Sequence, residues 1–313
     1  MIRTLTEVDE CRSVWQALSP GKKAWDDWDL MYAFHDQEAY SFNFLVKLSG
    51  NSPSGLVPLV KDLSDGSFEL FGGCYPDSRQ LWVAHDDFPE YFEHLPENTV
   101  FFDMNGPWVE ALLSLHPQYS GNFAERDNRY YLVPDEFDYD FNNHIAKFSS
   151  EKRKGFLYDL RKIREKGPEL HWSTDDESQL FIDLCNRRFG DDSDYVKEGG
   201  KAELRRVISE LRESGCLRTL TISMDGAKHA VSMSALYSGT MIALYAASNY
   251  DYKNLGKLLN VETIQEACRI RANEINYMTG MSWKEAWDMK SEAVYTMRKP
   301  AKVLTDNVSG AAS

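Results

Sequence analysis

The chain has 313 residues, 42% of them hydrophobic, 27% charged and 13% aromatic, and its 8 tryptophans and 16 tyrosines exclude an intrinsically disordered protein. The sequence contains no run of about 18 apolar residues, so it predicts no transmembrane helix. The N-terminal residues lack the apolar core of a secretory signal. The five cysteines and seven histidines have no disulfide or metal-ligand spacing. We therefore expect reduced thiols, a cytoplasmic location and no metal site.

The net charge of −14 is unevenly distributed. Residues 1–145 hold 9 Lys and Arg against 25 Asp and Glu, whereas the remaining residues hold 26 against 24. An acidic first half is a poor binder of nucleic acid such as DNA, so an anionic ligand should bind to the second half. The asymmetry predicts two domains, residues 1–143 and 144–313, although an acidic excess can also serve solubility alone.

The first half is predicted to begin with helices over residues 1–36, interrupted at 19–21. Strands are expected at 41–48, 55–60 and 67–71 as a three-strand meander, in which Pro58 indicates an edge or a bulge. A short helix at 88–94, a strand at 99–104, a helix at 107–115, a strand at 128–133 and a linker at 137–143 complete this half.

The second half opens with a predicted basic helix, residues 147–166, that holds eight Lys and Arg against three acids. Its apolar arc contains Phe156, Leu157, Leu160 and Ile163. The predicted elements that follow are a strand at 169–172, helices at 177–189 and 201–213, strands at 217–223, 230–237 and 241–248, a helix at 258–271 and a strand at 274–278. This order predicts an α+β fold rather than strict βαβ alternation.

The loop between the strand that ends near Tyr250 and the next helix is a candidate anion site. Its residues are Lys253, Asn254, Leu255, Gly256 and Lys257. A glycine-containing loop that opens a helix directs backbone N–H groups and the positive helix end at one point, which suits a phosphate or pyrophosphate. Two lysines at a helix start oppose the helix dipole, and a bound anion would explain them; the alternative is an ordinary helix start without a ligand.

Several motifs in this order resemble the GNAT superfamily of acyltransferases. They are the basic helix from Ser150 to Lys162, the turn from Asp225-Gly226 to Ala230, the element from Tyr250-Asp251 to Leu255–Leu259, and Gly280-x-x-Trp283-Lys284-x-x-Trp287. The pattern is more similar to the branch with two tandem GNAT-like halves, which includes Fem-type peptidoglycan aminoacyltransferases and CelD-like acetyltransferases. In the first half, Gly55–Leu59 and Phe71–Gly73 resemble a degenerate copy.

The resemblance implies two tandem GNAT-like domains, each a mixed, mostly antiparallel sheet flanked by helices, with the active cleft in the second. It implies transfer of an acyl group from acyl-CoA, as a co-substrate rather than a tightly bound cofactor, to an amine of a small molecule, sugar or peptide. One position departs from the pattern, because Leu258 replaces the small residue of the family's phosphate loop. The departure leaves two alternatives open, namely aminoacyl transfer from a charged tRNA, as in Fem-type enzymes, and a non-catalytic binding module.

Lys284 is the leading candidate for a catalytic residue, because it lies between Trp283 and Trp287 and corresponds to the motif lysine of the Fem-type enzymes. A partly desolvated ammonium there would stabilise an oxyanion or a phosphate, with Trp283 beside the substrate. The alternative is a surface lysine that covers two rings. Tyr250 is the candidate that protonates the leaving group, with Tyr245 and Tyr277 as competitors.

Arg153 and Arg161 are candidates for substrate binding, and Arg164 is a weaker one. Arg153 lies on the apolar arc of the basic helix. The alternative for all three is a solvated basic face whose aliphatic stems pack onto the helix. No carboxylate is distinguished as a general base, although Asp251 and Glu285 are candidates.

Overall fold

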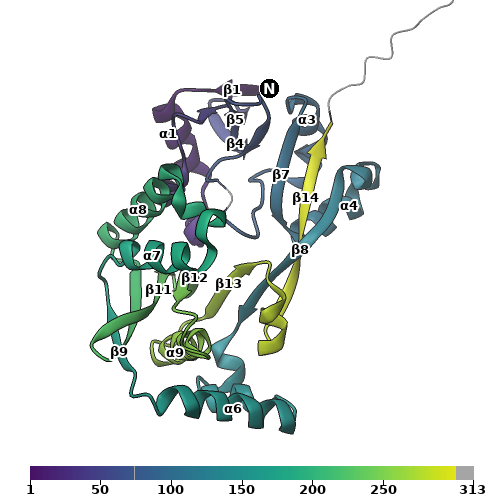
Figure 1. Cartoon of the computed structure of the whole chain (residues 1–313). Helices are drawn as coiled ribbons and strands as arrows, with labels where there is room; N and C mark the ends of the chain where they lie inside the picture. Colours follow the sequence, from purple (N-terminus) through teal and green to yellow (C-terminus); the bar gives the residue numbers. More distant parts are fainter. Residues whose placement is uncertain (74, 301–313) are drawn as a thin grey trace, which may run out of the picture.

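The computed structural model describes residues 1–73 and 75–300 (Figure 1). Its strands are β1 (Ile2–Leu5), β2 (Tyr40–Phe42), β3 (Phe44–Ser49), β4 (Ser52–Val57), β5 (Leu59–Asp62), β6 (Phe68–Leu70), β7 (Thr99–Asn105), β8 (Phe123–Leu132), β9 (Glu169–Ser173), β10 (Leu217–Met224), β11 (Ala227–Tyr237), β12 (Thr240–Ser248), β13 (Glu274–Thr279) and β14 (Lys290–Lys299). Its α-helices are α1 (Val8–Leu18), α2 (Trp28–Phe34), α3 (Phe88–His94), α4 (Gly106–Leu115), α5 (Phe141–Ala146), α6 (Ser150–Arg164), α7 (Ser178–Phe189), α8 (Glu198–Glu213) and α9 (Leu255–Arg269). The α+β fold expected from the sequence is confirmed.

One 11-stranded sheet runs through both halves of the chain in the order β2-β5-β6-β7-β14-β8-β13-β12-β11-β10-β9, and β1, β3 and β4 form a separate small sheet. The last strand, β14, lies between β7 and β8 of the first half and is antiparallel to both. Figure 1 shows these three strands side by side. The division of the chain at residues 143 and 144 stays a prediction, since the sheet continues across it.

The helices cover the two faces of the second-half sheet. Phe181 of α7, Leu204 of α8 and Trp15 of α1 are buried in one cluster with the side chains of β11 and β12 on that face. Leu259 of α9 and Phe156 of α6 are buried in a second cluster on the opposite face. The sheet therefore separates α7 from α9, and a ligand that contacts both helices must pass between strands.

The first half departs from the predicted meander at Pro58. Proline has no N–H to donate to a ladder, and the strand expected at 55–60 is divided there. β4 ends at Val57 and joins the small sheet, whereas β5 begins at Leu59 and joins the large one. The sequence also did not reveal β1 or β14, and the predicted linker contains the first half of α5.

The basic helix is α6, and its apolar face is narrower than predicted. Phe156, Leu160 and Ile163 are buried, but Leu157 is 46% exposed. Ser149 caps the helix by accepting a hydrogen bond from the Lys152 N–H at 3.3 Å, which fixes its start. Within the part of the chain that the structure describes, no helix combines the length and the apolar character needed to cross a bilayer.

Candidate active site

The parallel strands β12 and β13 pair over only three residues and then separate. The ladder joins Thr240–Ile242 to Glu274–Asn276, while β12 continues to Ser248 and β13 to Thr279. Beyond Ile242 and Asn276, the two strands no longer pair with each other. The divergence opens the sheet in its interior.

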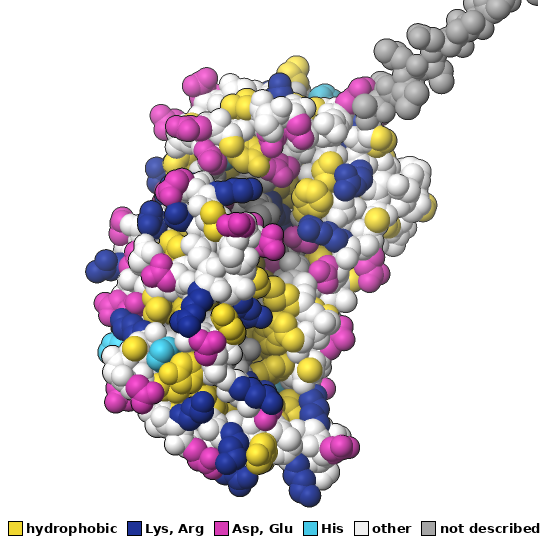
Figure 2. All heavy atoms as spheres, viewed as in Figure 1, with side chains coloured by type: hydrophobic (Ala, Val, Ile, Leu, Met, Phe, Trp, Pro, Cys, Tyr) yellow, Lys and Arg dark blue, Asp and Glu magenta, His cyan; other side chains and the backbone are white. Residues whose placement is uncertain are grey.

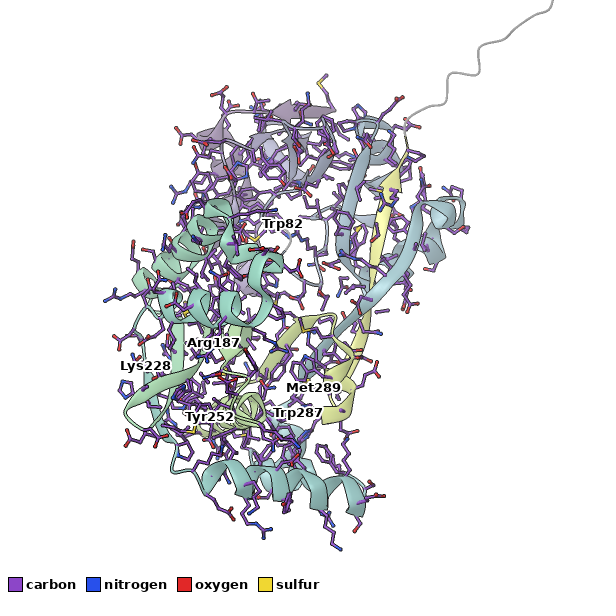
Figure 3. The ribbon with its side chains drawn as sticks, in the orientation of Figure 1. Trp82, Arg187, Lys228, Tyr252, Trp287 and Met289 are labelled. Carbon is purple, nitrogen blue, oxygen red and sulfur yellow. The ribbon has the colours of Figure 1, made fainter. Side chains whose placement is uncertain are left out.

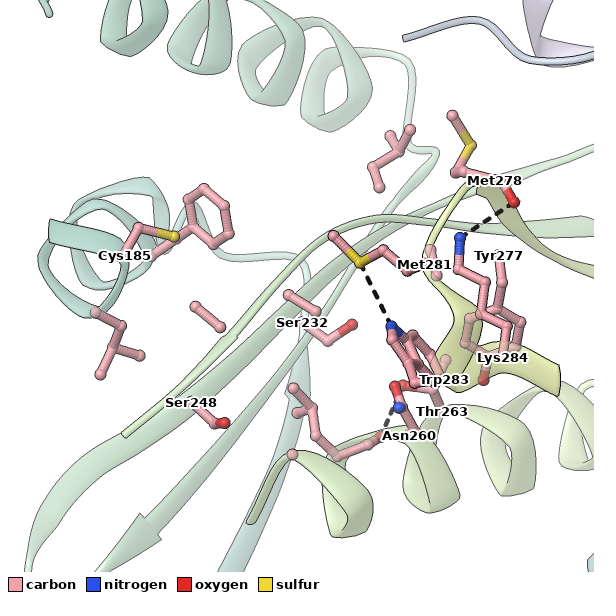
Figure 4. A pocket seen from close by; sticks show the side chains of 18 of the residues that line it. Cys185, Ser232, Ser248, Asn260, Thr263, Tyr277, Met278, Met281, Trp283 and Lys284 are labelled. Atoms are coloured by element: carbon pink, nitrogen blue, oxygen red, sulfur yellow. Dashed lines mark hydrogen bonds between the residues drawn. The ribbon is translucent and has the colours of Figure 1, made fainter. Parts of the chain in front are cut away.

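A cleft of about 610 Å³ occupies this opening. Phe181 and Cys185 of α7 line it on one face of the sheet, and Gly256 and Thr263 of α9 line it on the other. Figure 4 shows Cys185, Thr263 and Lys284 around the same space, and Figure 2 shows hydrophobic side chains gathered in the hollowed middle of one face with Lys and Arg beside them. The cleft therefore gives access to both faces of the sheet through one gap.

A β-bulge lies on the β12 side of the cleft. The β11–β12 ladder pairs Met233 with Tyr245 and Ser234 with Ala243, so Leu244 is an extra residue without a partner in that ladder. Leu244 lines the cleft. A bulge redirects backbone groups away from the ladder, and here it does so where β12 borders the opening.

The predicted anion loop lies at the end of the cleft. Asn254 precedes α9 in the left-handed conformation with φ 70°. In the first turn the Leu255 N–H donates to Tyr252 O and the Leu258 N–H to Asn254 O. Among the described residues, the N–H groups of Gly256 and Lys257 have no hydrogen-bond partner. Gly256 lines the cleft, and a Cβ at this position would lie 3.2 Å from Ser248 Oγ.

Leu255 and Leu258 point away from the cleft into the core between α9 and the sheet, where both are fully buried. Leu258 therefore does not obstruct the helix start. The position that departs from the family pattern is explained by packing, because the leucine fills the core.

The two lysines of the loop have protein partners or solvent around them. The Lys257 ammonium pairs with Asp159 of α6, and its hydrogen bond is the main cause that holds the pKa of Asp159 below its usual value. Lys253 is exposed. An ion pair between α9 and α6 thus supplies a structural reason for Lys257 at a helix start.

Lys284 is buried at the far end of the cleft and is only 4% exposed. Its Nζ donates to Thr279 O at 2.8 Å and to Met278 O at 3.2 Å, and it lies 5.6 Å from the centre of the Tyr130 ring. Burial lowers the pKa of Lys284 to about 8, against the opposing effect of Asp127 and Asp77. The prediction of a desolvated ammonium is consistent with this geometry, and the alternative of a surface lysine is not.

The backbone before Lys284 is held in uncommon conformations. Met278 and Met281 have φ of 64° and 68°, and both are non-glycine residues that flank Gly280 at 72°. Left-handed conformations in non-glycine residues cost free energy and cluster at functional sites. Trp283 is 37% exposed, lines the cleft and donates from Nε1 to Met281 Sδ at 3.4 Å, as Figure 4 shows.

The three candidate tyrosines lie in different surroundings. Tyr250 is 60% exposed and is absent from the cleft lining. Tyr245 is buried against Phe181 and Tyr75. Tyr277 is buried in the cleft wall, its hydroxyl has no hydrogen-bond partner among the described residues, and burial raises its pKa well above the usual value. Of the three candidates, Tyr277 is therefore the one that lines the cleft.

The candidate arginines of α6 are outside the cleft lining. Arg153 donates to Ala146 O at 3.1 Å, Arg161 lies 3.9 Å from Glu165, and Arg164 lies 3.1 Å from Glu262. The candidate base Asp251 is paired with Arg187 of α7 at 2.7 Å, near the loop that carries Tyr252 in Figure 3. Glu285 accepts from the Tyr130 hydroxyl at 3.1 Å.

Two cleft residues were missed by the sequence reasoning. Arg188 of α7 lies at the cleft with its guanidinium 5.0 Å from the centre of the Phe189 ring, and Tyr75 reaches the cleft from the first half. Among the described lining residues, Arg188 and Lys284 carry the only formal charges. A pair of adjacent arginines at the end of a helix was the available signal for Arg188, whereas nothing local distinguished Tyr75.

Comparison with known families agrees with the cleft geometry. Residues 150–287 match the acetyltransferase (GNAT) domain family. The second half of the chain therefore carries a GNAT domain. The match includes α6, the bulged strand β12, the loop at Gly256 and Lys284, so both ends of the cleft belong to the GNAT domain.

Solved structures extend the likeness to the whole chain. A protein of unknown function from Bacteroides thetaiotaomicron has 13% identity and a TM-score of 0.59, with 95% of this chain and 99% of that chain covered. FemX has 9% identity and a TM-score of 0.59, with 95% and 96% covered. A tandem GNAT protein from the clavulanic acid biosynthesis pathway has 12% identity and a TM-score of 0.55, with 97% and 99% covered.

At these identities the likenesses establish the fold, which is that of a tandem GNAT protein. No curated protein matches the chain. The specific donor and acceptor of this protein therefore have to be argued from its own residues.

Proposed function

We propose that the protein is an N-acyltransferase that moves an acyl group from acyl-CoA to an amine. The observation that carries the proposal is the cleft between β12 and β13, which joins an open helix N-terminus at one end to a buried lysine at the other. Its two formal charges, on Arg188 and Lys284, are both positive, which favours an anionic donor.

The start of α9 is the proposed site for the donor's phosphates. The N–H groups of Gly256 and Lys257 are open there, and the helix dipole adds a positive potential. Lys253 and Arg188 are exposed beside or at the cleft and would add charge. The rest of the donor would extend between the strands toward Leu244 and Lys284.

The transfer needs a nucleophilic amine, an electrophilic carbonyl and stabilisation of the charge that forms. The amine nitrogen attacks the thioester carbonyl carbon, a C–N bond forms, and the C–S bond breaks as the thiolate leaves. The amine loses one proton and the thiolate gains one. The bulged backbone at Leu244 and the Lys284 ammonium are proposed to stabilise the oxyanion, and the unpartnered Tyr277 hydroxyl is better placed than Tyr250 to protonate the thiolate.

Aminoacyl transfer from a charged tRNA is the second candidate, because α6 presents exposed basic side chains to solvent. These are Lys152, Lys154, Arg161, Lys162 and Arg164. An RNA that used this surface would bind more weakly as salt rises, with a slope set by the number of phosphates contacted. The open cleft argues against a non-catalytic module, and the cytoplasmic location expected from the cysteines stays a prediction.

Titration of the protein with coenzyme A and acetyl-CoA in a thermal-shift assay tests the donor site. A ligand at about 100 times its Kd stabilises the folded protein by about 2.7 kcal/mol, which is a shift of several degrees. Gly256→Trp should abolish the shift, because a side chain at Gly256 meets Ser248 Oγ at 3.2 Å and enters the cleft. Gly155→Trp is the matched control, since this helical glycine on α6 has open space around it.

A thioester shift that survives Gly256→Trp would place the donor elsewhere. The absence of any shift with either compound would contradict the acyl-CoA proposal and would direct attention to tRNA, whose binding can be measured across salt concentrations.

A further inference from the structure

A second cavity, of about 300 Å³, lies where the two halves of the chain meet. Its lining comes from the segment before α2, the loop before β7, and strands β7, β8, β12, β13 and β14. The polar and charged lining residues are Lys23, Asp77, Ser78, Asn105, Arg129, Thr240, Glu274, Asn276 and Glu292. None of these residues was singled out by the sequence, because they converge only in the folded sheet.

Asp77 forms the floor of the cavity and is only 1% exposed. Its Oδ1 accepts from Trp25 Nε1 at 2.9 Å and from Asn276 Nδ2 at 3.0 Å, and its Oδ2 accepts from Arg129 Nε at 3.1 Å. Both oxygens are engaged by the protein, so Asp77 holds the network together.

Glu274 and Glu292 can each accept further hydrogen bonds. Arg129 pairs with Oε1 of Glu274, and Oε1 of Glu292 accepts from Asn105 Nδ2 at 2.8 Å and from Ser78 Oγ at 3.3 Å. The second oxygen of each carboxylate has no partner among the described residues. Glu292 also forms no ion pair there, although it lies directly opposite Arg129 in the β14–β8 ladder.

The charges of the cavity do not balance. Three carboxylates, Asp77, Glu274 and Glu292, face one guanidinium, on the half-buried Arg129, and one exposed lysine, Lys23. Negative charge that is partly removed from water is costly unless it is paired, so the cavity favours one more cation. Burial also raises the pKa of Glu274, which an added positive charge would reverse.

This cavity is linked to the cleft through Asn276. The Asn276 side chain donates to Asp77 in the cavity and accepts from the Met278 N–H at 2.7 Å, where β13 turns away from β12. Ile242 lines the cavity and its neighbour Ala243 lines the cleft. The two spaces therefore meet at the point where the strands separate.

We infer that this cavity binds the primary ammonium group of a small acceptor, of about amino-acid size, with Glu292 and Glu274 as its hydrogen-bond acceptors. The inference rests on the proposed amine acylation and names the acceptor class and its site. A volume of about 300 Å³ is at the lower end of the range for ligand pockets. It suits a small molecule and excludes a folded protein.

Binding of three matched probes to the full chain tests the inference. L-alaninamide carries an ammonium group, L-alanine carries an ammonium and a carboxylate, and propionate carries only the carboxylate. Calorimetric titration should detect L-alaninamide at least as strongly as L-alanine, and should detect no propionate. Charge-assisted hydrogen bonds are the strong ones, so Glu292→Gln and Glu274→Gln should each weaken ammonium binding roughly 10- to 100-fold.

Glu136→Gln is the control, because Glu136 pairs with Lys290 outside the cavity and should leave probe binding unchanged. Propionate binding as tight as L-alaninamide, no binding of any probe, or unchanged affinity in both glutamine variants would overturn the inference. Coenzyme A binding is measured separately on the same proteins. If coenzyme A still binds while one of these results is found, only the acceptor site is overturned. If coenzyme A does not bind to the unmodified protein, the proposed donor is overturned.

Discussion

Replacing Lys284 by methionine should change how the stability of the protein depends on pH. The side chain is buried, and its pKa in the folded protein is about 8 against 10.5 for an ordinary lysine. The unfolded chain therefore binds more protons at this position in the window between these two values. Since stability rises with pH wherever the unfolded state binds more protons, the free energy of unfolding should increase across that window.

The magnitude follows from the size of the pKa difference. One pKa unit corresponds to about 1.36 kcal/mol, so the shift from 10.5 to about 8 represents about 3 kcal/mol. Below about pH 8 the folded protein bears this full cost of burying the ammonium, and above about pH 10.5 the cost is absent. Methionine removes the titration but leaves Met278 O and Thr279 O without a donor, at about 1 kcal/mol each.

The two effects oppose each other near neutral pH, and only the lost hydrogen bonds remain in alkaline solution. The unmodified protein should therefore gain about 2 to 3 kcal/mol relative to Lys284→Met between about pH 7 and about pH 10. Urea unfolding of both proteins at several pH values measures this difference, with Lys154→Met, an exposed lysine of α6, as the control. Parallel pH curves for the protein and Lys284→Met would refute the argument that the ammonium is buried and desolvated.

Two further predictions concern α6 and the cleft mouth. Leu160→Ala should destabilise the protein by about 2 to 5 kcal/mol in urea unfolding because Leu160 is buried, whereas Leu157→Ala should change stability by about 0.5 kcal/mol or less; equal losses would contradict the assigned face. Arg188→Ala should weaken binding of coenzyme A by roughly 10-fold but leave binding of pantetheine unchanged, because only the former carries phosphates. An equal loss for both ligands in calorimetry would argue that Arg188 supports packing alone.

The sequence predicted the second half well because its signals are local. Hairpin turns, alternation and helix stops lie within a few residues of the elements they define, and β10, β11, β12 and α7 were found within a few residues of their bounds. Gly256 and Lys284 were predicted separately as functional residues, and the structure brings both to one cleft. Their chemical roles remain predictions.

The features that the sequence did not reveal depend on distant pairing. β14 pairs with β7 and β8, which lie more than 150 residues earlier in the chain, and no local pattern identifies such partners. The cavity at Asp77 has the same origin, since its side chains come from seven segments that only the sheet order brings together. Leu157 was predicted to be on the buried face of α6 but is exposed, because helical periodicity does not show how far the neighbouring element covers that face.

The position of β14 also sets an order of events during synthesis. While a ribosome is making the chain, β7 and β8 emerge long before the strand that separates them, and each has an unpaired edge until β14 arrives. Open edges invite pairing with other chains, so the nascent first half is exposed to aggregation during this interval. The emergence of β14, rather than completion of the first half, is then the step that pairs both of these edges.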